Sequence, residues 1–145
     1  MAAVAACEAA RVMLPPVNRE TQVDKNGVIK SQKHHAWVRT RLCIAWERKE
    51  CEGPVECCHA RDIAPRGHGG GKPSSVFCVA MCRKHHRQSE KREKAWGDEF
   101  GIDVEVCCME FAAASPDFRV KAGALAHIKV MKERARHATA TKGEG

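Results

Sequence analysis

The sequence predicts a small α+β protein that is stabilised by zinc. Two short stretches rich in strand-forming residues are joined by a glycine-rich loop, and a long stretch without glycine or proline follows them. This pattern indicates the order strand, loop, strand, helix. Nine cysteines and eight histidines in 145 residues supply many metal ligands. Aromatic residues make up only 5% of the chain, so the core is thin, and a bound metal commonly stabilises a thin core.

Residues 1–33 are predicted to form a flexible N-terminal arm. A pair of prolines, the turn-forming run Asp24–Gly27 and few large apolar side chains give this segment little to bury, and only residues 4–13 suit a short helix. Acidic Glu8 interrupts the first apolar residues too early for a signal segment. No run of 18 apolar residues occurs. We therefore expect a cytoplasmic protein, in which thiols stay reduced and bind metal more often than they form disulfides.

Residues 34–118 are predicted to form the central domain, and residues 119–145 a C-terminal helix with a tail that frays from Thr139. The apolar spacing and the glycine and proline breaks place the elements of both parts. The expected elements are a helix over 34–46, strands over 55–59 and 76–80, a loop with four glycines over 64–73, and helices over 81–100, 104–114 and 121–136.

Four residues are the best candidates for a structural zinc site: Cys43, Cys51, Cys82 and His85. On a helix that starts at Cys82, with about 100° per residue, Cys82 and His85 lie about 60° apart. A tetrahedral site needs two more ligands, and Cys43 and Cys51 flank a loop just before the first strand. Structural zinc contributes roughly 10–16 kcal/mol of apparent binding energy in small peptides. Four other cysteines are interpreted as ordinary buried residues: Cys7, Cys78, Cys107 and Cys108.

A second candidate metal set is built around a pair of harder ligands. His86 and Glu90 lie about 40° apart on the same predicted helix, and Cys58 and His59 end the first strand. A divalent cation held by Cys58, His86 and Glu90 would polarise a scissile phosphate, and a histidine with a pKa near neutrality deprotonates water. Phosphodiester hydrolysis needs both functions, so His59 is the candidate base. The other histidines are interpreted as core or surface residues: His34, His35, His68, His127 and His137.

Positive charge gathers on the same segment as these ligands. From Arg61 to Arg92 the chain has eight Lys or Arg against two acidic residues, in a protein whose net charge is +7. Such a balance suits a phosphate backbone, although an isolated basic run is commonly only a solvated face. The candidate DNA contacts are Arg61, Arg66, Lys72, Arg83, Lys84, Arg87 and Lys91.

Six short motifs follow one another in the central part of the chain. They are His35–Arg39, Cys43, Cys51–Arg61, Gly71–Ser74, Met81–His86 and Phe100–Asp103. In order and content they resemble the HNH (His-Me finger, ββα-metal) endonucleases, most of all a small phage and prophage branch associated with recombination. The resemblance covers residues 34–118, well over half of the chain.

This resemblance implies a ββα-metal core and the hydrolysis of phosphodiester bonds in DNA. It implies His59 as general base, with Mg²⁺, Mn²⁺ or Zn²⁺ held near His86 and the residue four positions later. It also implies structural Zn²⁺ at the cysteine-rich site, and a phosphate contact by Arg61. The implied partners are double-stranded or branched DNA and phage or host recombination and replication proteins, in the cytoplasm of a bacterial host.

The chain departs from the family pattern at three places. Glu90 stands where relatives usually have His, and Cys58 stands before the base where many have Asp or His. The middle Asn has no counterpart, and Ser75 lies near a position where relatives often have Asp. These departures favour an alternative, a catalytically weak or inactive zinc-stabilised nucleic-acid-binding module. A redox or iron–sulfur protein is a third class, but the chain has no Cys-x-x-Cys pair.

Overall fold

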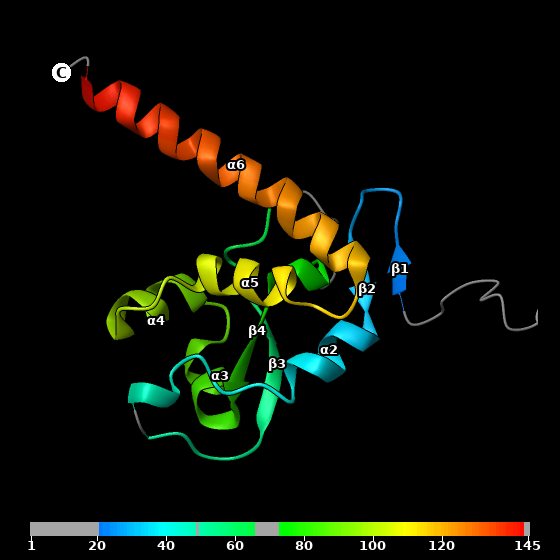
Figure 1. The fold of residues 1–145 in the computed structure, drawn as a ribbon. Coiled ribbons are helices and arrows are strands. Elements are labelled where there is room, and N and C mark those ends of the chain that lie inside the picture. Colours follow the sequence, from blue (N-terminus) through cyan, green and yellow to red (C-terminus); the bar gives the residue numbers. More distant parts are fainter. Residues whose placement is uncertain (1–20, 49, 66–72, 144–145) are drawn as a thin grey trace, which may run out of the picture.

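The computed structural model describes residues 21–48, 50–65 and 73–143 (Figure 1). The described part is α+β, as predicted, with two antiparallel hairpins and five helices. In chain order its elements are β1 (Thr21–Val23), β2 (Ile29–Ser31), α2 (Gln32–Val38), β3 (Val55–His59), β4 (Cys78–Cys82), α3 (Arg83–Ser89), α4 (Glu93–Phe100), α5 (Val104–Ala113) and α6 (Phe118–Gly143), with 3₁₀ turns at Trp46–Arg48 and Ser75–Phe77.

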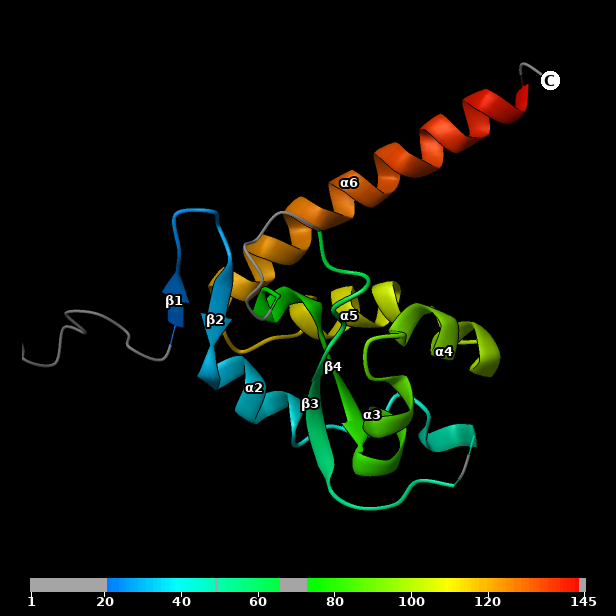
Figure 2. The ribbon, with the colours of Figure 1, turned by 180° about the vertical axis from the view of Figure 1, so that it is seen from behind.

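The β3–β4 hairpin lies at the centre of the molecule, among α2, α3 and α5 (Figures 1 and 2). Val55 pairs with Cys82 and His59 with Cys78, so the two strands align end to end. All five residues of β4 are buried, as expected for a strand that is covered on both faces. β3 has the bounds predicted for the first strand, residues 55–59. The core around it includes Met81, Trp96 and buried side chains of α5 and α6.

The second strand starts two residues later than predicted. The Ser74 hydroxyl accepts the N–H of Val76 and opens a 3₁₀ turn over Ser75–Phe77, as a capping serine does. The strand therefore covers Cys78–Cys82, and not residues 76–80. This shift places Cys78 opposite the end of β3.

Two predicted helices are shorter than expected. The helix predicted over residues 34–46 ends at Val38, and the N–H of Ile44 then bonds to the carbonyl of Ala80, which holds the following loop against β4. The helix predicted over residues 81–100 is broken into α3 and α4 at Lys91, whose φ of 64° is left-handed. A helix cannot continue through that conformation.

The N-terminal hairpin corrects part of the predicted arm. β1 and β2 form a folded pair, closed by a turn in which the Asp24 carboxylate accepts the N–H groups of Asn26 and Val28. Ser31 then caps α2 by accepting the N–H of His34. Residues 21–33 are therefore structured. The rest of the predicted arm, residues 1–20 with the expected helix at 4–13, lies outside the described residues.

The C-terminal helix is longer than predicted and belongs to the core at its start. α6 begins at Phe118, where the Asp117 carboxylate accepts the N–H of Arg119, and it continues past Thr139 to Gly143. Val120 and Ala124 are fully buried, whereas the C-terminal half extends away from the other elements (Figure 1). α5 has nearly the predicted bounds, with Asp103 as its cap.

Among the helices in the described part of the chain, none combines the length and the apolar character needed to cross a membrane.

Candidate metal centres

The structure brings together the four residues predicted to form a structural zinc site. His85 Nδ1 lies 3.1 Å from the sulfur of Cys82, 3.5 Å from that of Cys43 and 3.7 Å from that of Cys51. A tetrahedral zinc ion with usual bond lengths places sulfur and nitrogen ligands about 3.6 Å apart. The ligand atoms all lie within 4.8 Å of one another. The donor set therefore fits a metal ion such as zinc, and we call it the closed site.

Three separate segments build the closed site. Cys43 comes from the loop after α2, Cys51 from the segment before β3, and Cys82 from the end of β4, where it also caps α3. The first turn of α3 supplies His85, whose backbone N–H donates to the sulfur of Cys82. The rings of Trp96 and Phe100 pack against the imidazole of His85. The site thus joins a loop, a strand and a helix.

The thiols of the closed site differ in how readily they ionise. Desolvation and the neighbouring thiol of Cys43 raise the pKa of Cys51 to about 12. Burial also raises the pKa of Cys43. At Cys82 burial acts in the same direction. Hydrogen bonds from backbone N–H groups, first that of His85, and from the thiols of Cys51 and Cys43 outweigh it and bring the pKa below its usual value. A cation at the centre would favour all three thiolates, because it supplies the opposite charge.

A second group of ligand atoms surrounds His59. The side chains of His35, His59 and Cys78 each offer one such atom, and these atoms lie within 4.8 Å of one another. The ring of His35 meets that of His59 edge to face, with 4.9 Å between centroids. Ser75 Oγ lies 2.7 Å from His35 Nε2 and accepts the backbone N–H of Ser31. We call the three-residue group the open site, because it has one ligand fewer than the closed site. Both of its histidines are partly exposed, and Cys78 is buried.

Sequence reasoning missed two members of the open site. His35 and Cys78 were both interpreted as residues without a metal role. Cys78 meets His59 only through the strand register, and His35 meets it only because α2 packs on the hairpin. Aligned end to end, the two strands predicted from the sequence place Val76 opposite His59. Only the 3₁₀ turn at Ser75–Phe77, which moves the start of β4 to Cys78, brings that thiol there.

The predicted catalytic cation set is not brought together. His86 Nδ1 pairs with Glu56 Oε1 at 3.1 Å, and Glu90 follows the end of α3. Among the described residues, Cys58, His86 and Glu90 do not form a group of ligand atoms within 4.8 Å of one another. Cys58 is fully buried, and burial followed by the charge of Glu93 raises the pKa of its thiol to about 12.

Strand alternation separates His86 from the predicted base. Successive side chains of a strand point to opposite faces, and Glu56 is three residues before His59 on β3. Glu56 faces α3, where it contacts His86, while His59 faces α2, where it contacts His35. A cation at His86 would therefore lie across the hairpin from His59.

The predicted DNA contacts include both ion-paired and exposed basic residues. Arg83 pairs with Glu56 at 3.1 Å and Lys84 with Glu52 at 3.8 Å, so their charges are partly balanced. The other described members of the set are exposed, and two members lie outside the described residues. The exposed members are Arg61, Arg87 and Lys91; those outside are Arg66 and Lys72.

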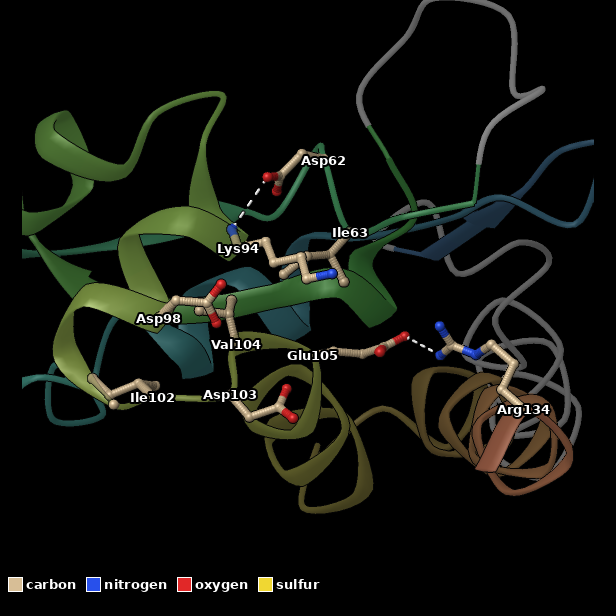
Figure 3. Close-up of a pocket in the computed structure, with 10 residues that line it drawn as sticks. Asp62, Ile63, Lys94, Asp98, Ile102, Asp103, Val104, Glu105 and Arg134 are labelled. Atoms are coloured by element: carbon tan, nitrogen blue, oxygen red, sulfur yellow. Dashed lines mark hydrogen bonds and ion pairs between the residues drawn. The ribbon is translucent and has the colours of Figure 1, made fainter. Parts of the chain in front are cut away.

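A pocket away from both metal groups is acidic. It lies among α4, α5 and α6, where Glu105 pairs with Arg134, and the backbone N–H of Lys94 donates to Asp62 (Figure 3). Two more carboxylates, Asp98 and Asp103, line it. Four carboxylates against two basic side chains disfavour a phosphate backbone there, so this pocket does not extend the candidate nucleic-acid surface.

The comparisons with known proteins leave the family open. No family model matches the chain, and no solved structure matches it. The chain is 28% identical over 75 residues to the uncharacterized protein YdfU of Escherichia coli strain K12, a match that covers 52% of this chain and 20% of that protein. The match thus spans about a fifth of the length of that relative.

Proposed function

We propose that this protein is a metal-dependent DNA endonuclease or nickase in which His59 activates the attacking water. The supporting observation is the setting of His59: a partly exposed imidazole at the end of β3, in contact with a second imidazole. The other end of the same hairpin carries the closed Cys/His site. A hairpin anchored in this way holds His59 on a rigid element, as a catalytic group requires.

The surroundings of His59 suit hydrolysis of a phosphodiester bond. The reaction needs a group that removes a proton from water and positive charge that stabilises the phosphate as the bond breaks. His59 is the candidate for the first role. Arg61 follows it by two residues, is exposed, and has its backbone N–H directed to Glu93; it is the candidate for the second role. Backbone contacts of this type read charge and not sequence.

Nicking of supercoiled plasmid tests the proposal. Wild type, His59→Ala and His137→Ala are compared with Mg²⁺, Mn²⁺, Zn²⁺ or EDTA. His137 is an exposed residue of α6, so its replacement is the matched control. We expect wild type and His137→Ala to cut alike and EDTA to abolish cutting. Loss of His59 should slow cutting at least about 100-fold, while DNA binding in a gel-shift assay survives. Cutting by His59→Ala at the wild-type rate would refute the role of His59.

A second candidate function is a zinc-stabilised nucleic-acid-binding module without catalysis. The observation that favours it is the separation of Cys58, His86 and Glu90, which were expected to hold a catalytic cation. This function predicts DNA binding that weakens steeply with salt, and no cutting with any divalent metal. Cutting that requires His59 would eliminate it. If no cutting occurs, Glu90→His tests whether the family's usual residue restores activity.

A further inference from the structure

We propose that His35, His59 and Cys78 form a second metal site, a zinc centre with three protein ligands and one position open to water. The proposal rests on the proposed function only for the reaction that the zinc would catalyse; the metal site itself is argued from geometry. It gives His59 a specific role, since the imidazole would activate water as a metal ligand and not as the free base that the family resemblance implies.

Three elements converge on this site. His35 comes from α2, His59 from the last residue of β3 and Cys78 from the first residue of β4. Their ligand atoms lie within 4.8 Å of one another, and one ion with bonds of about 2.0–2.3 Å would draw them to roughly 3.3–3.6 Å apart. Two imidazoles and a thiolate are borderline-soft ligands that suit Zn²⁺ and disfavour Mg²⁺.

The number of ligands distinguishes the open site from the closed site. The closed site has four ligands, the number that structural zinc uses. The open site has three, and the two histidines are partly exposed while Cys78 is 0% exposed. Solvent therefore contacts the two histidines of this site and not Cys78. Three protein ligands with a water in the fourth position are the arrangement of catalytic zinc.

The outer contacts of His35 support a role as a ligand. Ser75 is 1% exposed, and its Oγ lies 2.7 Å from His35 Nε2. The same Oγ accepts the N–H of Ser31 at 2.9 Å, so the hydroxyl is fixed in place. Ligating histidines typically bond a neighbouring group through the second ring nitrogen, which fixes the orientation of the ring. The hydrogen bond to the buried Ser75 orients the His35 ring in this way.

A zinc ion at this position would supply the nucleophile. Zinc lowers the pKa of a bound water to about 7, and the released proton passes to solvent. The hydroxide oxygen forms the new bond to phosphorus, the P–O ester bond breaks, and the leaving oxygen takes a proton from water. The reaction consumes one water and needs no oxidant or reductant.

Zinc content measured by mass spectrometry tests the site without reference to activity. Full-length protein is loaded with Zn²⁺, dialysed against metal-free buffer and assayed per chain, together with four variants. We expect His35→Ala and Cys78→Ala each to hold one zinc fewer than wild type. His137→Ala and Cys108→Ala are the matched controls, the first an exposed histidine and the second a buried thiol outside the site, and both should equal wild type.

The outcomes separate this inference from the proposed function. Equal zinc in His35→Ala and wild type would overturn the site, and His59-dependent nicking would then leave His59 as a free base. One zinc fewer in His35→Ala than in wild type, with no nicking by wild type, would support the site and refute the nuclease. If Cys78→Ala fails to fold, His35→Ala still tests the site, because His35 is partly exposed. A circular dichroism melt of the His35→Ala protein verifies that it is folded.

Discussion

Glu93 is a buried carboxyl group whose pKa is raised. It is 1% exposed, and burial followed by the neighbouring Asp62 raises its pKa from 4.5 to about 7. The unfolded chain releases this proton near pH 4.5, while the folded protein keeps it to about pH 7. The folded state therefore binds more protons over that interval, and the stability due to this group falls as the pH rises from about 4.5 to 7.

Replacing Glu93 by Gln should remove this pH dependence. The amide is neutral at every pH, so Glu93→Gln should be more stable than wild type by up to about 3 kcal/mol at pH 8, and equal to it below pH 4. Urea unfolding of both proteins from pH 4 to 8 measures the difference. The exposed Asp98→Asn is the matched control for replacing a carboxyl group by an amide. A difference that stays constant with pH would contradict the assignment.

At the scale of elements, the break between α3 and α4 depends on one residue. Lys91 has a φ of 64°, and the N–H of Arg92 bonds back to the carbonyl of Ser89 to close the turn. The left-handed conformation costs a side-chain-bearing residue about 1 kcal/mol, and more for a β-branched one. Glycine adopts it without that cost.

Opposite responses at two nearby lysines test this break. Lys91→Val should lower the free energy of unfolding by about 1 kcal/mol or more, and Lys91→Gly should not lower it. At exposed Lys94, in the first turn of α4, the order should reverse, because glycine is a poorer helix former than valine. Urea unfolding of the four variants measures both orders. A single helix across Lys91 would give the same order at both positions.

At the scale of the whole molecule, the closed site adds a metal link to the backbone hydrogen bonds that join the segment between α2 and β3 to β4 and α3. Cys43 and Cys51 lie on either side of a loop with one 3₁₀ turn, and the site attaches this loop to β4 and α3. The interior beside it is built mainly from Ala, Val and Cys side chains with Trp96. A metal that adds binding energy to such a core couples folding to metal binding.

Loss of one exposed ligand should therefore destabilise the whole fold. Cys51→Ser should lose one zinc and about 3 kcal/mol of stability, because the energy of metal binding is lost. Cys51 lies at the surface, so its replacement leaves no core cavity that would also lower stability. Thermal melts with and without EDTA measure this effect. Cys107→Ser, a half-buried thiol outside both metal groups, is the control. If Cys51→Ser melts like wild type in metal-loaded buffer, the closed site does not support the fold.

The sequence determined the features that depend on near neighbours. The bounds of β3 and α5 follow from residue type and a capping aspartate. The pair Cys82 and His85 follows from helical spacing. Cys43 and Cys51 follow from their position beside a loop just before the first predicted strand, and the structure brings all four to the same point.

Only the tertiary structure decided which groups surround His59. The alternation of β3 turns Glu56 and His86 away from it, and the register of β4 brings Cys78 to it. α2 adds His35 from a segment that the sequence linked to neither strand. These contacts join three elements that are distant along the chain. Their geometry depends on how a helix packs on a hairpin, and no local spacing in the sequence encodes that packing.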